Sequence, residues 1–184
     1  MKRTLDLTLT TILLIILIFP MIIIFLILKL FYTTKPIYFS KRIGKNNKIF
    51  LMPKFRTMEE NAPQVAKSII NKKYITNFGK FLRKFSLDEF PQFFSVLFGT
   101  MSLVGPRPAL YNQKKLIFLR TRKNIHNLYP GITGWAQING RDKISIYKKV
   151  HLDYFYYNNI SLMLDIKIIF LTVIRVFSFK NILH

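Results

Sequence analysis

"LTLTTILLIILIFPMIIIFLIL", residues Leu7–Leu28, is the stretch of sequence that decides the class of this fold. It runs for 22 residues without a charge and is bounded by Asp6 and Lys29. A helix rises about 1.5 Å per residue, so a helix of this length is just long enough for the hydrocarbon core of a bilayer. The segment is too long for the apolar core of a signal peptide, and no small-residue cleavage site follows it. The sequence therefore predicts a membrane helix that is retained.

Pro20 lies within this segment and predicts a kink or a break in the helix. Its ring nitrogen cannot donate a hydrogen bond to the carbonyl group of Ile16, and the ring presses against that turn. Both flanks of the segment are basic, with Lys2, Arg3, Lys29, Lys35, Lys41 and Arg42. Since basic flanks stay on the cytoplasmic side of a membrane, a helix that bends at Pro20 and returns to that side satisfies both of them. A single-pass helix with a proline kink is the alternative.

The composition of the whole chain points to membrane surfaces and phosphate groups. Its 184 residues are 51% hydrophobic, yet the formal net charge is +21. Apolar side chains favour burial in a core or a bilayer, while excess cations attract phosphate on lipids, nucleic acids or substrates. The chain has no cysteine, which excludes disulfides and thiolate metal sites, and with only three histidines a multi-histidine metal centre is not expected.

The rest of the chain predicts a small mixed fold. Strand-like runs around the polar turn Lys45–Lys48 predict a β-hairpin over residues 36–58, in which Pro53 marks an edge or bulged strand. Helical segments are expected over 59–73 and 89–98, and a short basic helix or turn over 75–85. A rigid loop is expected at Gly105–Pro108, and turns at 129–135 and 138–141.

The C-terminal segment 147–179 is rich in aromatic and aliphatic residues. The apolar run between Lys167 and Arg175 is only seven residues long, far short of the roughly 20 that a spanning helix needs. A helix lying in the membrane interface suits this segment better, with nearby tyrosines as anchors at Tyr154, Tyr156 and Tyr157. A buried core helix is the alternative.

Asp88 and Glu89 stand side by side in "KFSLDEFPQ", residues Lys84–Gln92, although the chain has only eight acidic residues against 29 basic ones. Adjacent helical residues point about 100° apart, so the two acids are expected to have different roles. Ser86 and Glu89 also match the capping-box pattern S-x-x-E, a purely structural use of the glutamate. A position near a helix start favours an ionised carboxylate, which suits a nucleophile or a metal ligand. A structural and a catalytic role both stay open at this point.

Several basic residues on ordered backbone are candidates for holding a diphosphate. Lys54 and Arg56 alternate with Phe55 in "KFRTM", so on a strand both cations face the same side. Arg107 is fixed between two prolines, and Arg141 ends an Asn-Gly turn. Cations on rigid loops suit phosphate binding, and arginine adds a bidentate fork.

The motifs "KRTLDL", "KFRTM", "LRKFSLDEFPQ", "MSLVGPRP" and "YPGITGWAQINGR" occur in this order, with the proline-containing apolar segment after the first. In this order they resemble the bacterial polyprenol-phosphate phosphoglycosyl transferases, the bacterial sugar transferase family, in its small monotopic form. The resemblance covers nearly the whole chain. It implies an α+β, predominantly helical fold: a monotopic membrane enzyme with a re-entrant N-terminal helix, a small β-hairpin and interfacial amphipathic helices. Residues 1–32 would form the re-entrant helix, broken near Pro20, and residues 33–184 a cytoplasmic-face catalytic domain with membrane-associated C-terminal helices.

The resemblance also implies a chemistry. Members of the family transfer a sugar 1-phosphate from a UDP-sugar, here expected to be an N-acetylated hexosamine or a derivative, to undecaprenyl phosphate. The family's Asp-Glu pair matches Asp88 and Glu89. This implies Asp88 as the nucleophile of a covalent phosphosugar intermediate that releases UMP, and Glu89 as a ligand of Mg²⁺. The residues expected to bind the substrate phosphates are Lys54, Arg56, Arg107 and Arg141.

The expected setting is the cytoplasmic face of the bacterial cytoplasmic (inner) membrane, where the reaction would be the first membrane step of glycoconjugate assembly, for a polysaccharide or a glycoprotein. The expected partners are the UDP-sugar donor, the undecaprenyl phosphate acceptor, membrane lipids and downstream glycosyltransferases, with no nucleic acid. Two other classes compete: a membrane-tethered basic protein that binds polyanions, and an inactive scaffold that retains the fold. The cations are spread along the chain, which disfavours the first of these.

Four positions depart from the family's common residues. Phe19 replaces a serine before the proline, Lys41 a glutamine, Pro53 a tyrosine and Thr100 the aspartate of a Gly-Asp-Met-Ser motif. None of them touches Asp88 or Glu89. Pro53 and Thr100 are the reason why the inactive scaffold stays among the hypotheses.

Overall fold

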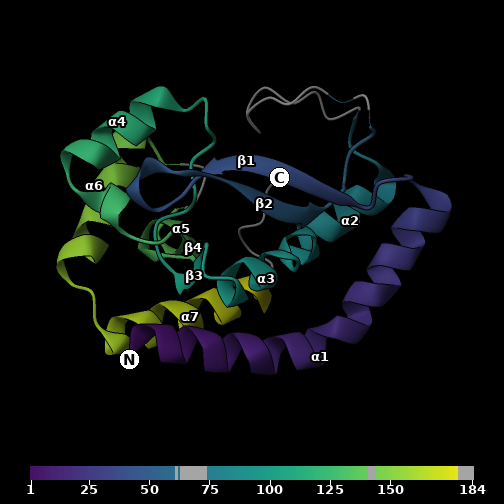
Figure 1. The fold of residues 1–184 in the computed structure, drawn as a ribbon, viewed down its shortest axis with the longest axis horizontal. Helices are drawn as coiled ribbons and strands as arrows, with labels where there is room; N and C mark the ends of the chain where they lie inside the picture. Colours follow the sequence, from purple (N-terminus) through teal and green to yellow (C-terminus); the bar gives the residue numbers. More distant parts are fainter. Residues whose placement is uncertain (61, 63–73, 141–143, 178–184) are drawn as a thin grey trace.

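The computed structural model describes residues 1–60, 62, 74–140 and 144–177. These residues form a mostly helical structure with two small two-stranded sheets. The long helix α1 (Lys2–Phe31) runs along one side, and the other elements lie above it in the view of Figure 1. The predicted α+β, predominantly helical class is confirmed.

The apolar segment makes up most of α1, which is bent but not broken. The helix is continuous through Pro20, and Figure 1 shows it bending partway along its length. The predicted break near Pro20 is therefore corrected to a bend, because the helical hydrogen bonds on either side persist when the proline removes one of them. Among the described residues, α1 is the one helix long and apolar enough to cross a membrane.

One face of α1 packs on the rest of the molecule and the opposite face is exposed. The buried face carries Leu14, Met21, Ile24 and Leu28, which form a cluster with Phe55 and Leu82. The exposed face includes Ile15, Ile16, Phe19, Leu30 and Phe31. A continuous apolar surface of this extent is unusual in water and suits contact with lipid.

Polar side chains at the start of α1 dock on the globular part. Lys2 Nζ lies 2.7 Å from Asp165 Oδ2 and donates to the Val104 carbonyl oxygen at 3.1 Å. The buried Asp6 carboxylate accepts a hydrogen bond from the Ser102 hydroxyl at 2.8 Å. Lys2 therefore pairs with protein groups in addition to any role as a flanking cation.

The other end of α1 is tied to the same globular part. Thr34, just beyond the helix, donates to Glu60 Oε1 from its amide at 3.0 Å and from its hydroxyl at 2.9 Å. Hydrogen bonds from Thr33 and Thr34 lower the pKa of Glu60 to about 2, so this acceptor stays ionised. Both ends of the apolar helix are thus held by one body, although the chain between them is 30 residues long.

The predicted β-hairpin is confirmed. Strands β1 (Ile37–Ile43) and β2 (Ile49–Phe55) pair antiparallel, and the turn between them contains the short helix η1 (Lys45–Asn47). Pro53 lies opposite Phe39. Since the sheet has only two strands, both are edge strands, where a proline is tolerated.

The second sheet was not predicted. Strand β3 (Ser102–Val104) pairs parallel with β4 (Gly131–Thr133), which occupies the segment expected to be a turn at 129–135. The helix α5 (Trp135–Ile138) follows at once. The turn predicted from the Pro-Gly signal is therefore wrong: Tyr129 and Pro130 form neither a turn nor a bend, and Gly131 begins the strand. A three-residue strand has too little periodicity to be seen in the sequence.

The remaining elements are helices. They are α2 (Asn77–Lys84), η4 (Leu87–Glu89), α3 (Gln92–Leu97), α4 (Lys114–Arg122), η5 (Ile125–Asn127), α6 (Ile146–Asn158) and α7 (Leu162–Phe177). The helix predicted over 75–85 is confirmed as α2. The helix predicted over 89–98 is shorter and begins after the 3₁₀ turn η4. The helix predicted over 59–73 lies largely outside the described residues.

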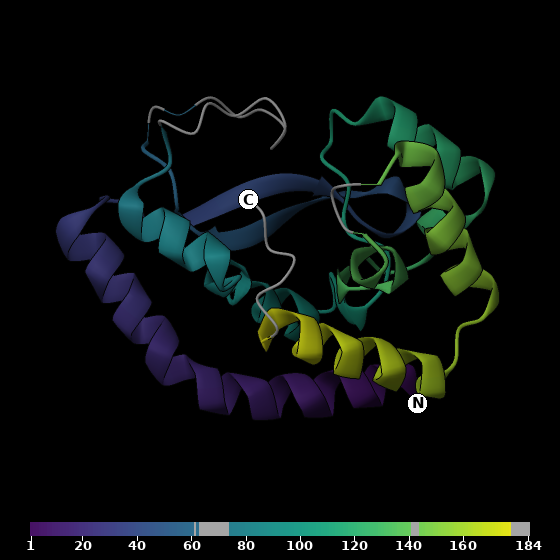
Figure 2. The ribbon, with the colours of Figure 1, turned by 180° about the vertical axis from the view of Figure 1, so that it is seen from behind.

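The C-terminal segment forms two helices, and one of them lies beside α1. Figure 2 shows α7 alongside the N-terminal part of α1, where Lys2 pairs with Asp165. One face of α7 is buried at Ile168, and the other is exposed at Phe170. Tyr156 is buried in the core, so its prediction as an interfacial anchor is wrong. A tyrosine can enter a core when its hydroxyl finds an acceptor, here Asp165 at 2.6 Å.

Candidate active site

Asp88 and Glu89 lie in the 3₁₀ turn η4 between α2 and α3. Ser86, which precedes this turn, has a left-handed backbone (φ 57°) and makes no side-chain capping bond. The capping-box interpretation of Ser86 and Glu89 is therefore wrong. Instead the turn frees the Glu89 side chain for partners that are distant in the sequence.

The Glu89 carboxylate joins two cations from other elements. Lys54 Nζ, on β2, lies 2.7 Å from Glu89 Oε1, and Arg107 Nη2 lies 2.6 Å from the same oxygen. A second Arg107 nitrogen, Nη1, donates to Oε2 at 3.4 Å. The Glu89 and Lys54 side chains are only 12% and 13% exposed. The structure thus brings together three of the predicted site residues, Glu89, Lys54 and Arg107, in a group that we call the Glu89 clamp.

Charges set the protonation states within the clamp. Burial alone would raise the pKa of Glu89, but Arg107 and Lys54 hold it well below its usual range. Burial lowers the pKa of Lys54, an effect that the Glu89 carboxylate opposes and the Arg107 guanidinium reinforces. Glu89 is therefore an ionised acceptor at neutral pH, and it carries the compensating charge for two partly buried cations.

Asp88 lies next to the clamp in a different electrostatic setting. Its carboxylate acts on the Lys54 ammonium and on the Arg83 guanidinium, where it opposes the lowering of the pKa that burial causes. Arg83 Nε donates to the Thr57 hydroxyl at 2.8 Å, which fixes this cation beside the turn. The two adjacent acids thus share Lys54 and differ in their second cation, which is Arg83 for Asp88 and Arg107 for Glu89. An aspartate among cations has the environment in which an anionic substrate can approach a carboxylate.

The loop that carries Arg107 is held by the second sheet. The Gly105 amide donates to the Thr133 carbonyl oxygen at 2.9 Å, and the Gly131 amide donates to the Pro106 carbonyl oxygen at 3.0 Å. A Cβ atom on Gly131 would lie 2.1 Å from the Gly105 nitrogen, so the two backbones meet more closely than any side chain allows. The "GPRP" and "YPGITGW" motifs therefore form one rigid unit.

Arg120 and Asp153 support this rigid unit, and the sequence did not mark either residue as part of the site. Arg120 Nη2 lies 2.6 Å from Asp153 Oδ2, with side chains only 9% and 2% exposed. Arg120 Nη1 also donates to the Arg107 carbonyl oxygen at 2.8 Å. In the sequence Arg120 is one basic residue among several in α4, and nothing local marks its partner 33 positions away.

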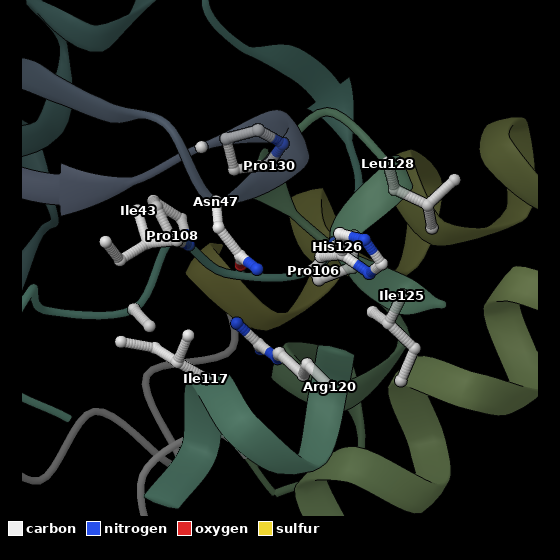
Figure 3. Close-up of a pocket in the computed structure, with 12 residues that line it drawn as sticks. Ile43, Asn47, Pro106, Pro108, Ile117, Arg120, Ile125, His126, Leu128 and Pro130 are labelled. Carbon is white, nitrogen blue, oxygen red and sulfur yellow. The ribbon is translucent and has the colours of Figure 1, made fainter. Parts of the chain in front are cut away.

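A small cavity lies beside the same loop (Figure 3). Its volume is about 30 Å³, and its lining includes Pro106, Pro108, Arg120 and His126. A cavity of this size has room for about two water molecules. It is therefore too small for a nucleotide sugar. Most of its lining is apolar, and its polar side chains include His126, whose Nδ1 has no hydrogen-bond partner among the described residues.

One predicted phosphate ligand, Arg56, is not part of the clamp. Arg56 lies above the ring of Tyr38, which is directly opposite Lys54, so Arg56 and Lys54 do share a face. Arg56 Nε, however, donates to the Lys35 carbonyl oxygen at 2.8 Å, at the far end of the hairpin from the turn. Arg141 lies outside the described residues. The Asn-Gly turn before it is present, with Gly140 at φ 137°.

Mg²⁺ binds to oxygen ligands, which the acidic side chains of the site can supply. Within residues 1–60, 62, 74–140 and 144–177, no three His, Asp or Glu side chains form a metal cluster. Mg²⁺ is often held by one or two carboxylates together with substrate phosphates and water. Glu89 fits this mode of binding, because its Oε2 accepts a long hydrogen bond of 3.4 Å in the clamp.

Comparison with known proteins agrees with these features. Residues 1–179 match the model of the family described as bacterial sugar transferase. An uncharacterized sugar transferase, EpsL, of Bacillus subtilis is 43% identical over 80% of this chain and 73% of its own length. A UDP-glucose:undecaprenyl-phosphate glucose-1-phosphate transferase of Escherichia coli is 39% identical over 98% of this chain.

A third relative is the undecaprenyl-phosphate galactose phosphotransferase of Salmonella typhimurium, 34% identical over 94% of this chain. This chain spans only 41% and 39% of the lengths of the E. coli and Salmonella relatives. The match to the family nevertheless covers almost all of the present sequence. The chain belongs to the bacterial sugar transferase family, as its ordered motifs predicted.

Proposed function

We propose that this protein is a phosphoglycosyl transferase that moves a sugar 1-phosphate from a UDP-sugar to undecaprenyl phosphate. The observation that carries the proposal is the pairing of Asp88 with the Glu89 clamp, where a carboxylate lies beside fixed cations. The names of the E. coli and Salmonella relatives, which print undecaprenyl phosphate as the acceptor, support it. For the sugar we propose an N-acetylated hexosamine or a derivative, on the family resemblance alone.

In the first proposed step, an oxygen of the Asp88 carboxylate forms a bond to the phosphorus that carries the sugar. The bond between this phosphorus and the bridging oxygen breaks, and UMP leaves with the electron pair. The product is a sugar phosphate joined to Asp88. Lys54 and Arg107, held at fixed positions by Glu89, stabilise the negative charge on the phosphoryl oxygens and the leaving group.

In the second step, an oxygen of the acceptor phosphate bonds to the same phosphorus. The bond to Asp88 breaks, which restores the carboxylate and gives a diphosphate-linked lipid. This division into two steps suits a water-soluble donor and a membrane-bound acceptor, because the two substrates need not meet at one moment. Asp88 is the proposed nucleophile, and Glu89 is the residue that orients the cations.

Mg²⁺ is the proposed cofactor, and Glu89 would hold it together with the donor phosphates. When bound, it would neutralise charge on the diphosphate. The support is chemical: a buried carboxylate that is ionised at neutral pH has the ligand type that Mg²⁺ prefers.

We further propose that α1 enters the membrane and returns to the cytoplasmic face of the cytoplasmic membrane. The bend in α1 and the attachment of both of its ends to one globular body support this arrangement. A helix that crossed the bilayer would place its two ends on opposite sides, where one small body could not hold both. Fusion of a reporter enzyme to each end would test it, since re-entry predicts a cytoplasmic location for both.

The test of the reaction is UMP release by protein purified in detergent or nanodiscs. The mixture contains Mg²⁺, undecaprenyl phosphate and a panel of UDP-sugars, including glucose, galactose and N-acetylated hexosamines. We expect UMP with one class of donor, and its loss in Asp88→Asn and in EDTA. Folded protein that is silent with the whole panel would contradict the proposal, as would robust turnover by Asp88→Asn.

A further inference from the structure

Four aromatic rings form a row on the outside of α2, which we call the aromatic ladder. The rings belong to Tyr32, Phe78, Phe81 and Phe85. Tyr32 and Phe78 are stacked at 5.5 Å between centroids, Phe78 and Phe81 are stacked at 6.0 Å, and Phe81 and Phe85 are tilted at 5.0 Å. The ladder is therefore continuous from the end of α1 to the end of α2.

The ladder lies beside the packing face of α2, and Phe78 itself packs against the core cluster that includes Leu82. Gly79 and Leu82 are buried, and a Cβ atom on Gly79 would lie 2.1 Å from the Thr57 carbonyl oxygen, so the orientation of α2 is fixed. On the outer face Phe81 is 49% exposed and Tyr32 is 45% exposed. A row of partly exposed rings, held in register by a fixed helix, has the properties of a binding surface for an apolar ligand.

The two ends of the ladder have different surroundings. Tyr32 directly follows α1, the apolar helix that we place in the membrane. Phe85 directly follows α2, three residues before Asp88, and Lys84 Nζ lies 5.7 Å from the centre of its ring. The ladder thus leads from the end of α1 to the Lys84 ammonium, on a residue four positions before the proposed nucleophile in the sequence.

We propose that the aromatic ladder binds the isoprenoid chain of the polyprenyl phosphate acceptor. In this arrangement the chain lies along the rings and its phosphate group is directed towards Lys84 and Asp88. The proposal rests on the proposed function, and it assigns a binding surface for one of the two substrates. A single apolar chain that ends in a phosphate matches both the continuous row of rings and the positive charge of Lys84 at its end. Curved, methyl-branched chains also pack well on aromatic faces.

The first test separates the two half-reactions. A single turnover with donor alone reports the formation of the Asp88 adduct as a burst of UMP, and steady-state turnover reports use of the acceptor. In Phe81→Ala we expect a burst of the wild-type size and a KM for undecaprenyl phosphate that rises about threefold to tenfold, as for the loss of one aromatic contact. Phe118→Ala is the matched control, because Phe118 is 60% exposed on α4, away from the ladder. An unchanged acceptor KM in Phe81→Ala, or an equal rise in Phe118→Ala, would overturn the proposal.

The second test identifies the occupant. Protein in phosphatidylglycerol vesicles is irradiated with a diazirine-labelled polyprenyl phosphate or, separately, with a diazirine-labelled phosphatidylglycerol. We expect the polyprenyl probe to label the peptide that contains Phe78–Phe85, with competition by unlabelled undecaprenyl phosphate. Equal labelling by the phospholipid probe without such competition would mean that the ladder only contacts the bilayer, and would overturn the proposal. Absence of a UMP burst from wild-type protein with every donor would refute the proposed function instead. The labelling result would then decide by itself whether the ladder binds the polyprenyl chain.

Discussion

Replacing Arg120 by methionine separates two contributions of one side chain: the stability of the fold and the position of Arg107. Arg120 pairs with Asp153 at 2.6 Å, and it donates to the Arg107 carbonyl oxygen at 2.8 Å. Methionine keeps most of the volume but removes both interactions. Asp153 is then a buried carboxylate, 2% exposed, without its cation.

The cost follows from this burial. Removing one partner of a buried ion pair typically costs about 3–5 kcal/mol, because the other charge is left without compensation. In a domain of this size, about 1 kcal/mol shifts the melting temperature by about 2–4 °C. We therefore expect Arg120→Met to melt about 6–20 °C below the wild type. Arg122→Met, at an exposed position on the same helix, should stay within about 0.5 kcal/mol.

The assay compares single and double variants. Thermal unfolding in detergent measures stability, and UMP release with a saturating acceptor measures kcat/KM for the donor. Replacing both partners of a buried pair by apolar residues is often neutral for stability. Arg120→Met/Asp153→Leu should therefore recover most of the lost melting temperature. It should not recover kcat/KM, because the hydrogen bond to the Arg107 carbonyl is still absent and the loop is less well positioned.

Two results would refute this reasoning. If Arg120→Met has the melting temperature of the wild type, the ion pair of Arg120 and Asp153 is not effectively buried. If the double variant regains both stability and full kcat/KM, the bond to the Arg107 carbonyl has no effect on the site. Recovery of stability with a persistent defect in kcat/KM is the outcome that the structure predicts.

Three further predictions concern the site itself. Asp88→Asn should lower UMP release by about 10³-fold or more, since an amide cannot replace the carboxylate nucleophile, and mass spectrometry should find no sugar phosphate adduct on it. Gly131→Ala should destabilise the fold by about 1–3 kcal/mol, because its Cβ atom would lie 2.1 Å from the Gly105 nitrogen. Gly44→Ala is the milder control in thermal unfolding, because its Cβ atom would lie 3.1 Å from the Phe50 side chain and 3.4 Å from the Lys48 carbonyl oxygen. The two cations of the clamp lower the pKa of Glu89 overall, against the effect of burial, so the unfolded chain binds a proton more readily than the folded one below about pH 4.3. The stabilisation from Glu89 is hence present above that pH and is lost as the pH falls through the pKa of Glu89 in the folded protein. In urea unfolding from pH 6 to pH 3, the free energy of unfolding should decline less in Glu89→Gln than in the wild type. Parallel declines in the two proteins would contradict the ion pairs of the clamp.

Local patterns were sufficient for several elements. The hairpin was predicted because two strand-like runs flank a polar turn, and the turn is where the chain reverses between Ile43 and Ile49. Helix α2 was predicted from its own residues, and Thr76 caps it by accepting a hydrogen bond from the Gly79 amide at 2.9 Å. In each case the determining interactions lie within a few residues of one another, where sequence spacing reports them directly.

Other elements were misread because a distant partner decides them. The spacing of Ser86 and Glu89 suggested a cap, but Lys54 and Arg107 attract the Glu89 carboxylate more strongly than a backbone amide does. Strand β4 exists only because β3 lies beside it. Tyr156 resembled an interfacial anchor, yet the core accepts it because Asp165 satisfies its hydroxyl.

The sequence by itself determined that this protein has a long apolar helix with a proline, an excess of cations and a rare pair of acids, because these are properties of composition and local spacing. It also determined the family, because five motifs occur in a set order. Only the tertiary structure decided which cations meet Glu89, since Lys54 is 35 positions away and Arg107 is 18 positions away. An ion pair between such residues depends on how the whole chain closes, and charges that look alike in the sequence become distinct when burial selects their partners.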